Sequence, residues 1–463
     1  MHRNELESLF AQVAAYAAKR RLGDGDRKHR PDASYADMLE RMALPLSNDG
    51  MPVFDTIERL TQQAEPGLGA MTGPRFFGWV IGGSSPAGVA ADWLTSVWGQ
   101  NVANHLASPA AAAAEEVSGQ ALLDLMDLPR ESSIGFVTGA TMASFTCLAA
   151  ARSEVLLRAG WDIEAQGIFG APPVTIVLGE EAHSTIFAGL KYLGFGDANI
   201  VKVAVDRNGA MHVAAFAEAM AQASGPIIAI AQAGHINSGA FDPFTDMARV
   251  AKMKDAWLHI DGAFGLWARA TPTHRHLGEG ADLADSWSVD GHKWLQTPYD
   301  CAYAIVRHSE AHARAMRIPA SYLPGAGDGA RNPSDYVPEL SRRARGFATW
   351  AMIAHLGRKG IAEMITRHCA LARRFAQHLG AEPGVEILND VVLNQVAVTF
   401  GDDSQTKATI ARVQQDGVCF VGGATWRGRE VMRISVCNEN TTEADVDISA
   451  EAMLKAWADV KSA

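Results

Sequence analysis

The chain has 463 residues, enough for two or three domains and a sizeable hydrophobic core. Its 41 Lys and Arg against 52 Asp and Glu leave a net charge of −11, which disfavours nucleic-acid binding because that needs a basic surface. A hydrophobic content of 48% with 20% charged residues is typical of globular proteins and excludes extensive disorder.

Membrane association and metal binding are also disfavoured by the sequence. No apolar run reaches the roughly 18 residues of a membrane-spanning helix. The first residues include acidic side chains and no apolar signal core. The five cysteines are scattered without a CxxC pair, which disfavours both a disulfide framework and a structural zinc site. We therefore expect a cytoplasmic protein that uses no metal.

In chain order, residues 1–85 are predicted to form an N-terminal arm that opens with an amphipathic helix. From about residue 130 onward, apolar strands alternate with helical segments. This pattern is typical of a mostly parallel sheet covered by helices, which we assign to a large domain over 86–345. The predicted strands are 133–137, 174–178, 200–205, 227–231, 257–260, 286–289 and 302–306. Ligands of such sheets bind beyond the carboxyl ends of the strands.

The pattern changes after about residue 345. A long predicted helix over 349–379 is followed by a strand over 396–400, a helix over 406–416 and a strand over 431–436. Alternation of this kind over a short stretch is typical of a small α+β domain, which we assign to residues 346–463.

Two residues stand just past predicted buried strands. Lys293 lies in the segment SVDGHKW, and Asp261 lies earlier in the segment HIDGAFG. Alone, each has an ordinary explanation, as a surface lysine and as a helix N-cap. Together they are the pair that pyridoxal 5′-phosphate (PLP) requires, because a lysine forms an imine with its aldehyde and an acid pairs with its ring nitrogen.

Two weaker signals support the same interpretation. The segment VTGATM at 137–142 runs from a strand through a turn of small residues into a helix, and exposed N–H groups there bind phosphate. His183 follows another predicted strand and could stack on a cofactor ring, although a lone histidine is more often structural.

Together these four segments resemble the group II PLP-dependent amino-acid decarboxylases, the family of aromatic-L-amino-acid, histidine and glutamate decarboxylases. The resemblance covers nearly the whole chain. It implies the α/β fold-type-I architecture of the aspartate aminotransferase-like PLP enzymes. It also implies a small-molecule amino-acid substrate and a homodimer with active sites at the subunit interface.

The resemblance also implies roles for individual residues. Lys293 would form the Schiff base with PLP, and Asp261 would pair with the pyridinium nitrogen. His183 would stack on one face of the ring and Ala263 would pack on the other. Tyr336 would donate the proton to Cα. Four further residues are expected to contact the cofactor: Ala140, Thr141, His235 and His292.

The chain departs from the family in several places. Phe77, Trp79 and His105 occupy the expected substrate pocket, but in segments that differ from the usual ones. Asp290 stands where an Asn often helps to hold the phosphate, and a carboxylate there would repel it. Arg433 could bind a substrate carboxylate or form a structural ion pair.

The function expected from this resemblance is decarboxylation of an L-amino acid to its amine, and an aromatic side chain is one option. The same cofactor site also supports a lyase or aldolase that cleaves Cα–Cβ, or a decarboxylase that forms an aldehyde. An aminotransferase is less favoured. The alternative from another class is a PLP-binding protein without catalytic activity.

Overall fold

The structure is a computed structural model that describes residues 3–318 and 330–462. Its contacts divide the chain into two compact units. The central unit comprises residues 80–373 and 388–397, and the terminal unit comprises residues 1–79, 374–387 and 398–463. The three domains expected from the sequence, with boundaries near 85 and 345, stay a prediction.

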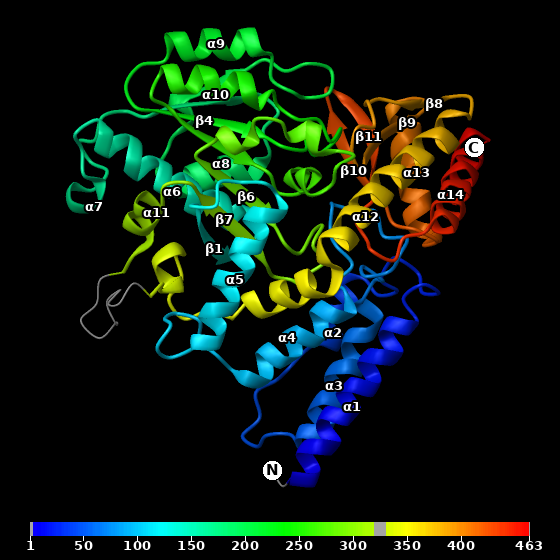
Figure 1. Cartoon of the computed structure of the whole chain (residues 1–463). Coiled ribbons are helices and arrows are strands. Elements are labelled where there is room, and N and C mark those ends of the chain that lie inside the picture. The colour runs from blue at the N-terminus through cyan, green and yellow to red at the C-terminus, as the bar shows by residue number, and fades with distance from the viewer. Residues whose placement is uncertain (1–2, 319–329, 463) are drawn as a thin grey trace. The chain divides into compact units, whose positions relative to one another are not determined.

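A mixed sheet of seven strands forms the middle of the central unit (Figure 1). Its order is β1-β7-β6-β5-β4-β2-β3. The strands are β1 Ser133–Val137, β2 Thr175–Gly179, β3 Ile200–Val203, β4 Ile227–Gln232, β5 Trp257–Asp261, β6 Ser286–Asp290 and β7 Ala302–Val306. Strand β7 is antiparallel to β1 and β6, whereas β6, β5, β4, β2 and β3 pair in parallel. The fold class predicted from the sequence is therefore confirmed.

Helices connect these strands because consecutive parallel strands need crossovers. The α-helices of this unit are α4 Pro86–Trp98, α5 Pro109–Leu125, α6 Ala140–Arg158, α7 Ile163–Gln166, α8 Ser184–Tyr192, α9 Val213–Gln222, α10 Phe244–Met253 and α11 Ser309–Met316. Helix α6 packs across β1, β7, β6, β5 and β4, and its buried residues share one apolar core with those of the sheet. This packing holds the start of α6 at the carboxyl end of the sheet, close to β6.

The terminal unit holds helices from both ends of the chain. They are α1 Arg3–Leu22, α2 Tyr35–Arg41, α3 Val53–Ala64, α13 Asp403–Asp416 and α14 Glu443–Lys461. A second sheet has the order β10-β11-β9-β8. Its strands are β8 Val385–Ile387, β9 Gln395–Phe400, β10 Gly422–Trp426 and β11 Arg429–Ser435. Both sheet pairings β8–β9 and β10–β11 are antiparallel.

Helix α12, Gly346–Gly380, corresponds to the long helix predicted over 349–379. It is broken at Gly357, whose φ of 58° lies in the left-handed region that favours glycine. Among residues 3–318 and 330–462, no helix combines the length and apolarity that crossing a bilayer requires.

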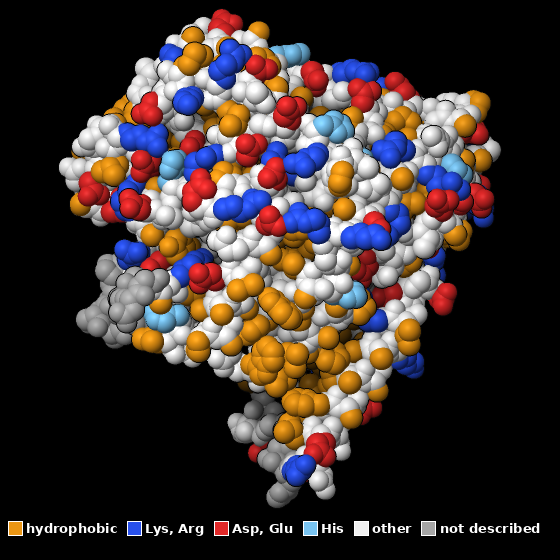
Figure 2. All heavy atoms as spheres, in the orientation of Figure 1, with side chains coloured by type: hydrophobic (Ala, Val, Ile, Leu, Met, Phe, Trp, Pro, Cys, Tyr) orange, Lys and Arg blue, Asp and Glu red, His pale blue; other side chains and the backbone are white. Residues whose placement is uncertain are grey.

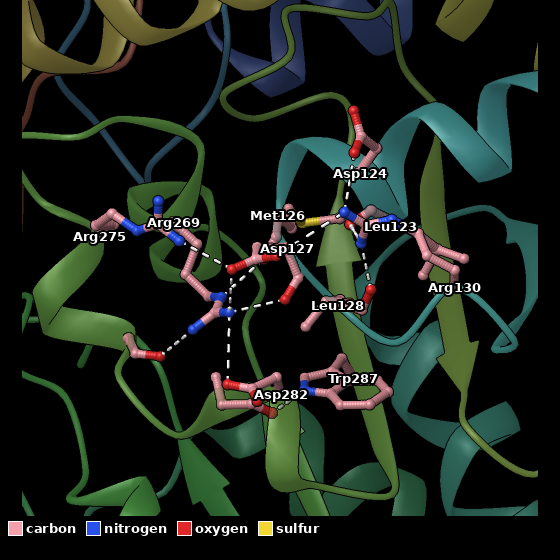
Figure 3. A network of polar contacts seen from close by, with 12 residues as sticks. Leu123, Asp124, Met126, Asp127, Leu128, Arg130, Arg269, Arg275, Asp282 and Trp287 are labelled. Atoms are coloured by element: carbon pink, nitrogen blue, oxygen red, sulfur yellow. Dashed lines mark hydrogen bonds and ion pairs between the residues drawn. The ribbon is translucent and has the colours of Figure 1, made fainter.

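A buried arginine ties the turn after α5 to the segment between β5 and β6 (Figure 3). Arg269 donates hydrogen bonds to the carbonyls of Met126 and Gly278. It also contacts the carboxylates of Asp127 and Asp282, at 3.4 and 3.5 Å. Because the Arg269 side chain is only 7% exposed, these acceptors satisfy a charge that would otherwise be costly to bury. The network joins the turn after α5 to the segment that leads into β6.

Candidate active site

A cavity of about 260 Å³ lies at the carboxyl ends of β4, β5 and β6, beside the start of α6. The parallel register places Gln232, which ends β4, opposite Asp261, which ends β5, and both residues line the cavity. Seven residues predicted from the sequence line this cavity: Ala140, Thr141, His183, Asp261, Ala263, His292 and Lys293. Residues far apart in the sequence thus converge as expected for a ligand site.

Lys293 lies on the turn after β6. Its Nζ atom is 2.7 Å from Oδ2 of Asp290, which is 2% exposed. The turn is held by Gly82, whose N–H donates to the carbonyl of His292. A Cβ on Gly82 would lie 2.3 Å from the carbonyl oxygen of Lys293, so only glycine allows this close approach. Gly82 therefore positions the lysine, and the sequence by itself did not point to it.

Asp261 is the last residue of β5 and is 5% exposed. Its Oδ1 accepts the N–H of Ala263 at 3.2 Å and lies 3.4 Å from Oγ of Ser288. These contacts orient the carboxylate at the cavity wall. An acid in this position fits the protonated ring nitrogen of PLP.

His183 forms the N-cap of α8. Its Nδ1 accepts the N–H of Thr185 at 3.3 Å and lies 2.7 Å from Oγ1 of the same residue. These two contacts fix the plane of the imidazole at the cavity. The ring therefore has a structural role as a cap and can also provide a flat surface to a ligand.

The start of α6 and the residues after β6 form the other end of the cavity. The N–H of Ala140 donates to Oδ1 of Asp290 at 2.7 Å, and the N-cap residue Gly139 provides no side-chain bond. Helix α6 begins at Ala140, and Asp290 satisfies this first N–H. Burial lowers the pKa of His292, whose Nδ1 accepts the N–H of Cys301. The first turn of α6 with the His292 side chain suits an anionic group such as phosphate.

His235 does not line this cavity among the residues that the structure describes, although its neighbours Gly234 and Ile236 do. It is 2% exposed, and its Nε2 lies 3.1 Å from Oε2 of Glu181. The predicted contact of His235 with the cofactor stays a prediction.

The other predicted residues lie elsewhere. Tyr336 is half-buried in the 3₁₀ turn Pro333–Tyr336 beside β1, where its ring faces the guanidinium of Arg331. Nδ1 of His105 lies 2.8 Å from Oδ1 of Asn332. Neither Tyr336 nor His105 is among the described residues that line the cavity.

Two further predicted substrate residues, Phe77 and Trp79, belong to the terminal unit. Phe77 is buried against the ring of Phe375, whereas Trp79 is 56% exposed and packs beside Phe420. Their predicted contact with substrate stays untested.

Comparison with known proteins identifies the family. The model of the pyridoxal-dependent decarboxylase conserved domain matches residues 37–400. The chain belongs to this family. The family, PLP as cofactor and amino-acid decarboxylation, all predicted from the sequence, are thereby confirmed, and the geometry of Lys293, Asp261 and the start of α6 fits the cofactor.

The individual relatives have low sequence identity to this chain. The chain is 27% identical to aromatic-L-amino-acid decarboxylase from Sus scrofa, over 86% of this chain and 85% of the relative. It is 26% identical to 4-hydroxyphenylacetaldehyde synthase from Rhodiola rosea, over 87% and 84% of the two chains. The crystal structure of Oryza sativa TDC with PLP and tryptamine superposes with a TM-score of 0.92 at 23% identity, covering 99% of both chains.

Proposed function

We propose that this decarboxylase converts an L-amino acid with an aromatic side chain to its amine and CO₂. The observation that carries the proposal is the convergence of Lys293, Asp261 and the start of α6 on one cavity. Phe264 and Ile236 also line that cavity and add apolar surface to it. The names of the relatives from Sus scrofa and Bacillus atrophaeus support the aromatic substrate class.

Each residue would contribute a separate part of the chemistry. When bound, PLP supplies an electron sink for the pair left on Cα as CO₂ departs. Lys293 would hold the cofactor covalently through its Nζ. Asp261 would keep the proton on the ring nitrogen, because a nearby negative charge favours the protonated form. His183 and Ala263 would hold the two faces of the ring.

The start of α6, at Ala140 and Thr141, would bind the phosphate together with His292. His235 would act from behind the cavity wall through the loop that carries His183. Phe77, Trp79 and His105 stay our candidates for contacts with the substrate side chain. Tyr336 stays our candidate for the acid that protonates Cα.

The test is a panel of L-amino acids supplied to the purified holoenzyme, with amine, aldehyde and CO₂ measured together. Amine with an equal amount of CO₂ supports the proposal. Aldehyde in place of amine would indicate an aldehyde-forming reaction, as the name of the Rhodiola rosea relative describes. Glycine with an aldehyde would indicate Cα–Cβ cleavage, and PLP binding without any product would indicate a non-catalytic protein.

Lys293→Ala provides the matched test of the site. We expect loss of turnover and of the visible absorbance of lysine-linked PLP, with an unchanged fold by circular dichroism. Lys254→Ala, on an exposed lysine whose Nζ contacts only a backbone carbonyl in the described bonds, is the control and should behave as the wild type. Full turnover of the Lys293 variant would refute the assignment.

We also propose a homodimer with active sites at the interface. Helix α4 exposes four large apolar side chains: Trp93, Leu94, Val97 and Trp98, which are 42%, 47%, 64% and 48% exposed. Figure 2 shows hydrophobic side chains gathered over the region where Figure 1 labels this helix. Contiguous apolar surface of this kind is typical of subunit interfaces. Val97→Glu should shift the mass measured by light scattering from dimer to monomer, and an unchanged dimer would exclude this surface.

A cytoplasmic location is the last part of the proposal. All five cysteines are buried and unpaired, as is usual in a reducing compartment. Cell fractionation with an antibody against the chain tests it.

A further inference from the structure

A buried carboxylate stands at the end of the cavity that suits an anion. Oδ1 of Asp290 accepts the N–H of Ala140 at 2.7 Å, and this N–H is the first of helix α6. The first N–H groups of a helix have no acceptor within the helix, and they carry its positive dipole. One of the donors that a phosphate would use is therefore already taken by a negative charge.

Asp290 has little freedom to leave this position. It is 2% exposed, and its own N–H donates to the carbonyl of Ala263 at 2.9 Å. Its carbonyl accepts the indole N–H of Trp267 at 3.0 Å. These bonds fix the backbone of Asp290 on both sides of the side chain, so the carboxylate stays at the start of α6.

The charged and titratable groups around Asp290 do not remove its repulsion of a bound phosphate. The ion pair of 2.7 Å with Lys293 offsets the carboxylate, but Lys293 is also the residue assigned to the aldehyde of the cofactor. Nε2 of His292 lies 3.5 Å from Oδ1 of Asp290, and burial lowers the pKa of this imidazole, which favours its uncharged form. A dianion bound beside Asp290 therefore meets a second negative charge where the dielectric screening is weak.

We propose that Asp290 weakens the binding of the cofactor through its phosphate, by competing with that phosphate for the start of α6. This inference rests on the proposed function, since it needs the phosphate at Ala140 and Thr141. It predicts that the enzyme exchanges its cofactor readily, and that removal of one charge tightens the complex.

Asp290→Asn in the cofactor-free enzyme tests the proposal. The amide keeps an oxygen for the N–H of Ala140 but lacks the charge. We expect the dissociation constant for PLP, from quenching of tryptophan fluorescence, to fall by about tenfold or more. The constant for pyridoxal, which has no phosphate, should change by less than about twofold.

Asp285→Asn is the matched control. Asp285 precedes β6, at the opposite end of the strand from Asp290, and its carboxylate accepts the N–H of Leu258. The net charge changes equally, yet PLP affinity should stay at the wild-type value. If Asp290→Asn fails to fold, Asp290→Ser carries the test, because its hydroxyl can also accept a hydrogen bond.

Unchanged or weaker PLP binding by the Asp290 variants would overturn the proposal, as would an equal gain for PLP and pyridoxal. The visible absorbance of lysine-linked PLP separates this failure from a failure of the proposed function. Its appearance in wild type and variant with equal affinity would refute only the role of Asp290. Its absence from both would refute the cofactor site as well.

Discussion

The Nε2 atom of His235 lies 3.1 Å from Oε2 of Glu181, and this contact joins the turn after β4 to the loop that carries His183. Nδ1 of His235 accepts the N–H of Asn237 at 3.3 Å, so Nε2 bears the hydrogen and donates a hydrogen bond to the carboxylate. A Cβ on Gly209 would lie 2.8 Å from the imidazole, which brings a third turn, the one after β3, against the same ring. His235 and Glu181 thus support the cavity wall from behind.

Glu181→Ala should loosen this support. It leaves the buried N–H of His235 without its carboxylate, which costs about 1–3 kcal/mol of the free energy of unfolding. We also expect several-fold weaker PLP binding, because the loop of His183 loses its anchor. Urea unfolding and fluorescence titration measure the two effects. Glu181→Gln keeps an acceptor and should lie close to wild type, whereas a Glu181→Ala enzyme equal to wild type in both assays would exclude this role.

A buried ion pair predicts a larger effect on stability. The guanidinium of Arg342 binds both carboxylate oxygens of Glu115, at 2.6 and 2.8 Å, and the two side chains are 2% and 0% exposed. Arg342→Ala should lower the free energy of unfolding by about 3–5 kcal/mol, because Glu115 is left charged and buried. Chemical denaturation measures this loss.

The control is Arg358→Ala, which removes a side chain that is 59% exposed and contacts Asp124. Exposed pairs contribute at most about 1 kcal/mol, so this variant should unfold near the wild-type midpoint. The double variant Arg342→Met with Glu115→Leu should recover most of the lost stability. If Arg342→Ala and Arg358→Ala lower the free energy of unfolding equally, the buried pair contributes no more to stability than the exposed one.

Because His259 and His312 are buried, we predict that the free energy of unfolding falls in weak acid. Burial lowers the pKa of His259 and of His312 from 6.5 to about 3, so the folded protein keeps both neutral while the unfolded chain protonates them. Stability is then fully present above pH 6.5 and is lost as the pH falls from 6.5 toward 3.

Each of these histidines contributes a slope of up to about 1.4 kcal/mol per pH unit within that window. His259→Gln should therefore flatten the curve of unfolding free energy against pH between 5 and 6.5, measured by urea unfolding. An unaltered slope for the His259 variant would contradict the assignment.

The position of Tyr336 leads us to predict that two inactive variants complement each other in a mixed dimer. Its ring faces Arg331 and the edge of His312 beside β1, so within one chain it is outside the described lining of the cavity. If it protonates Cα in the proposed homodimer, it acts on the cavity of the partner subunit. Tyr336→Phe and Lys293→Ala should each be inactive, and a mixture of the two unfolded and refolded together should regain roughly a quarter of wild-type activity. A mixture that stays inactive would remove Tyr336 from the mechanism in trans.

The sequence by itself determined the strands and the residues at their ends. Apolar runs such as those of β5 and β6 are local signals, and parallel strands necessarily bring their carboxyl ends to one edge of a sheet. The sequence alone therefore assigns Lys293, Asp261, His183 and the start of α6 to one cavity. The segments around them were also specific enough to identify the family.

Only the tertiary structure decided what surrounds those residues. Asp290 binds both Ala140 and Lys293, and His235 lies behind the cavity. Both arrangements depend on which loops pack together, and the order of residues along the chain does not reveal that packing. The close approach of Gly82 to the turn of Lys293 is likewise a contact between distant segments. Hydrogen bonds and burial of this kind arise from packing between segments that are far apart in the sequence. The hydrophobic periodicity of a sequence reports local structure and not such contacts.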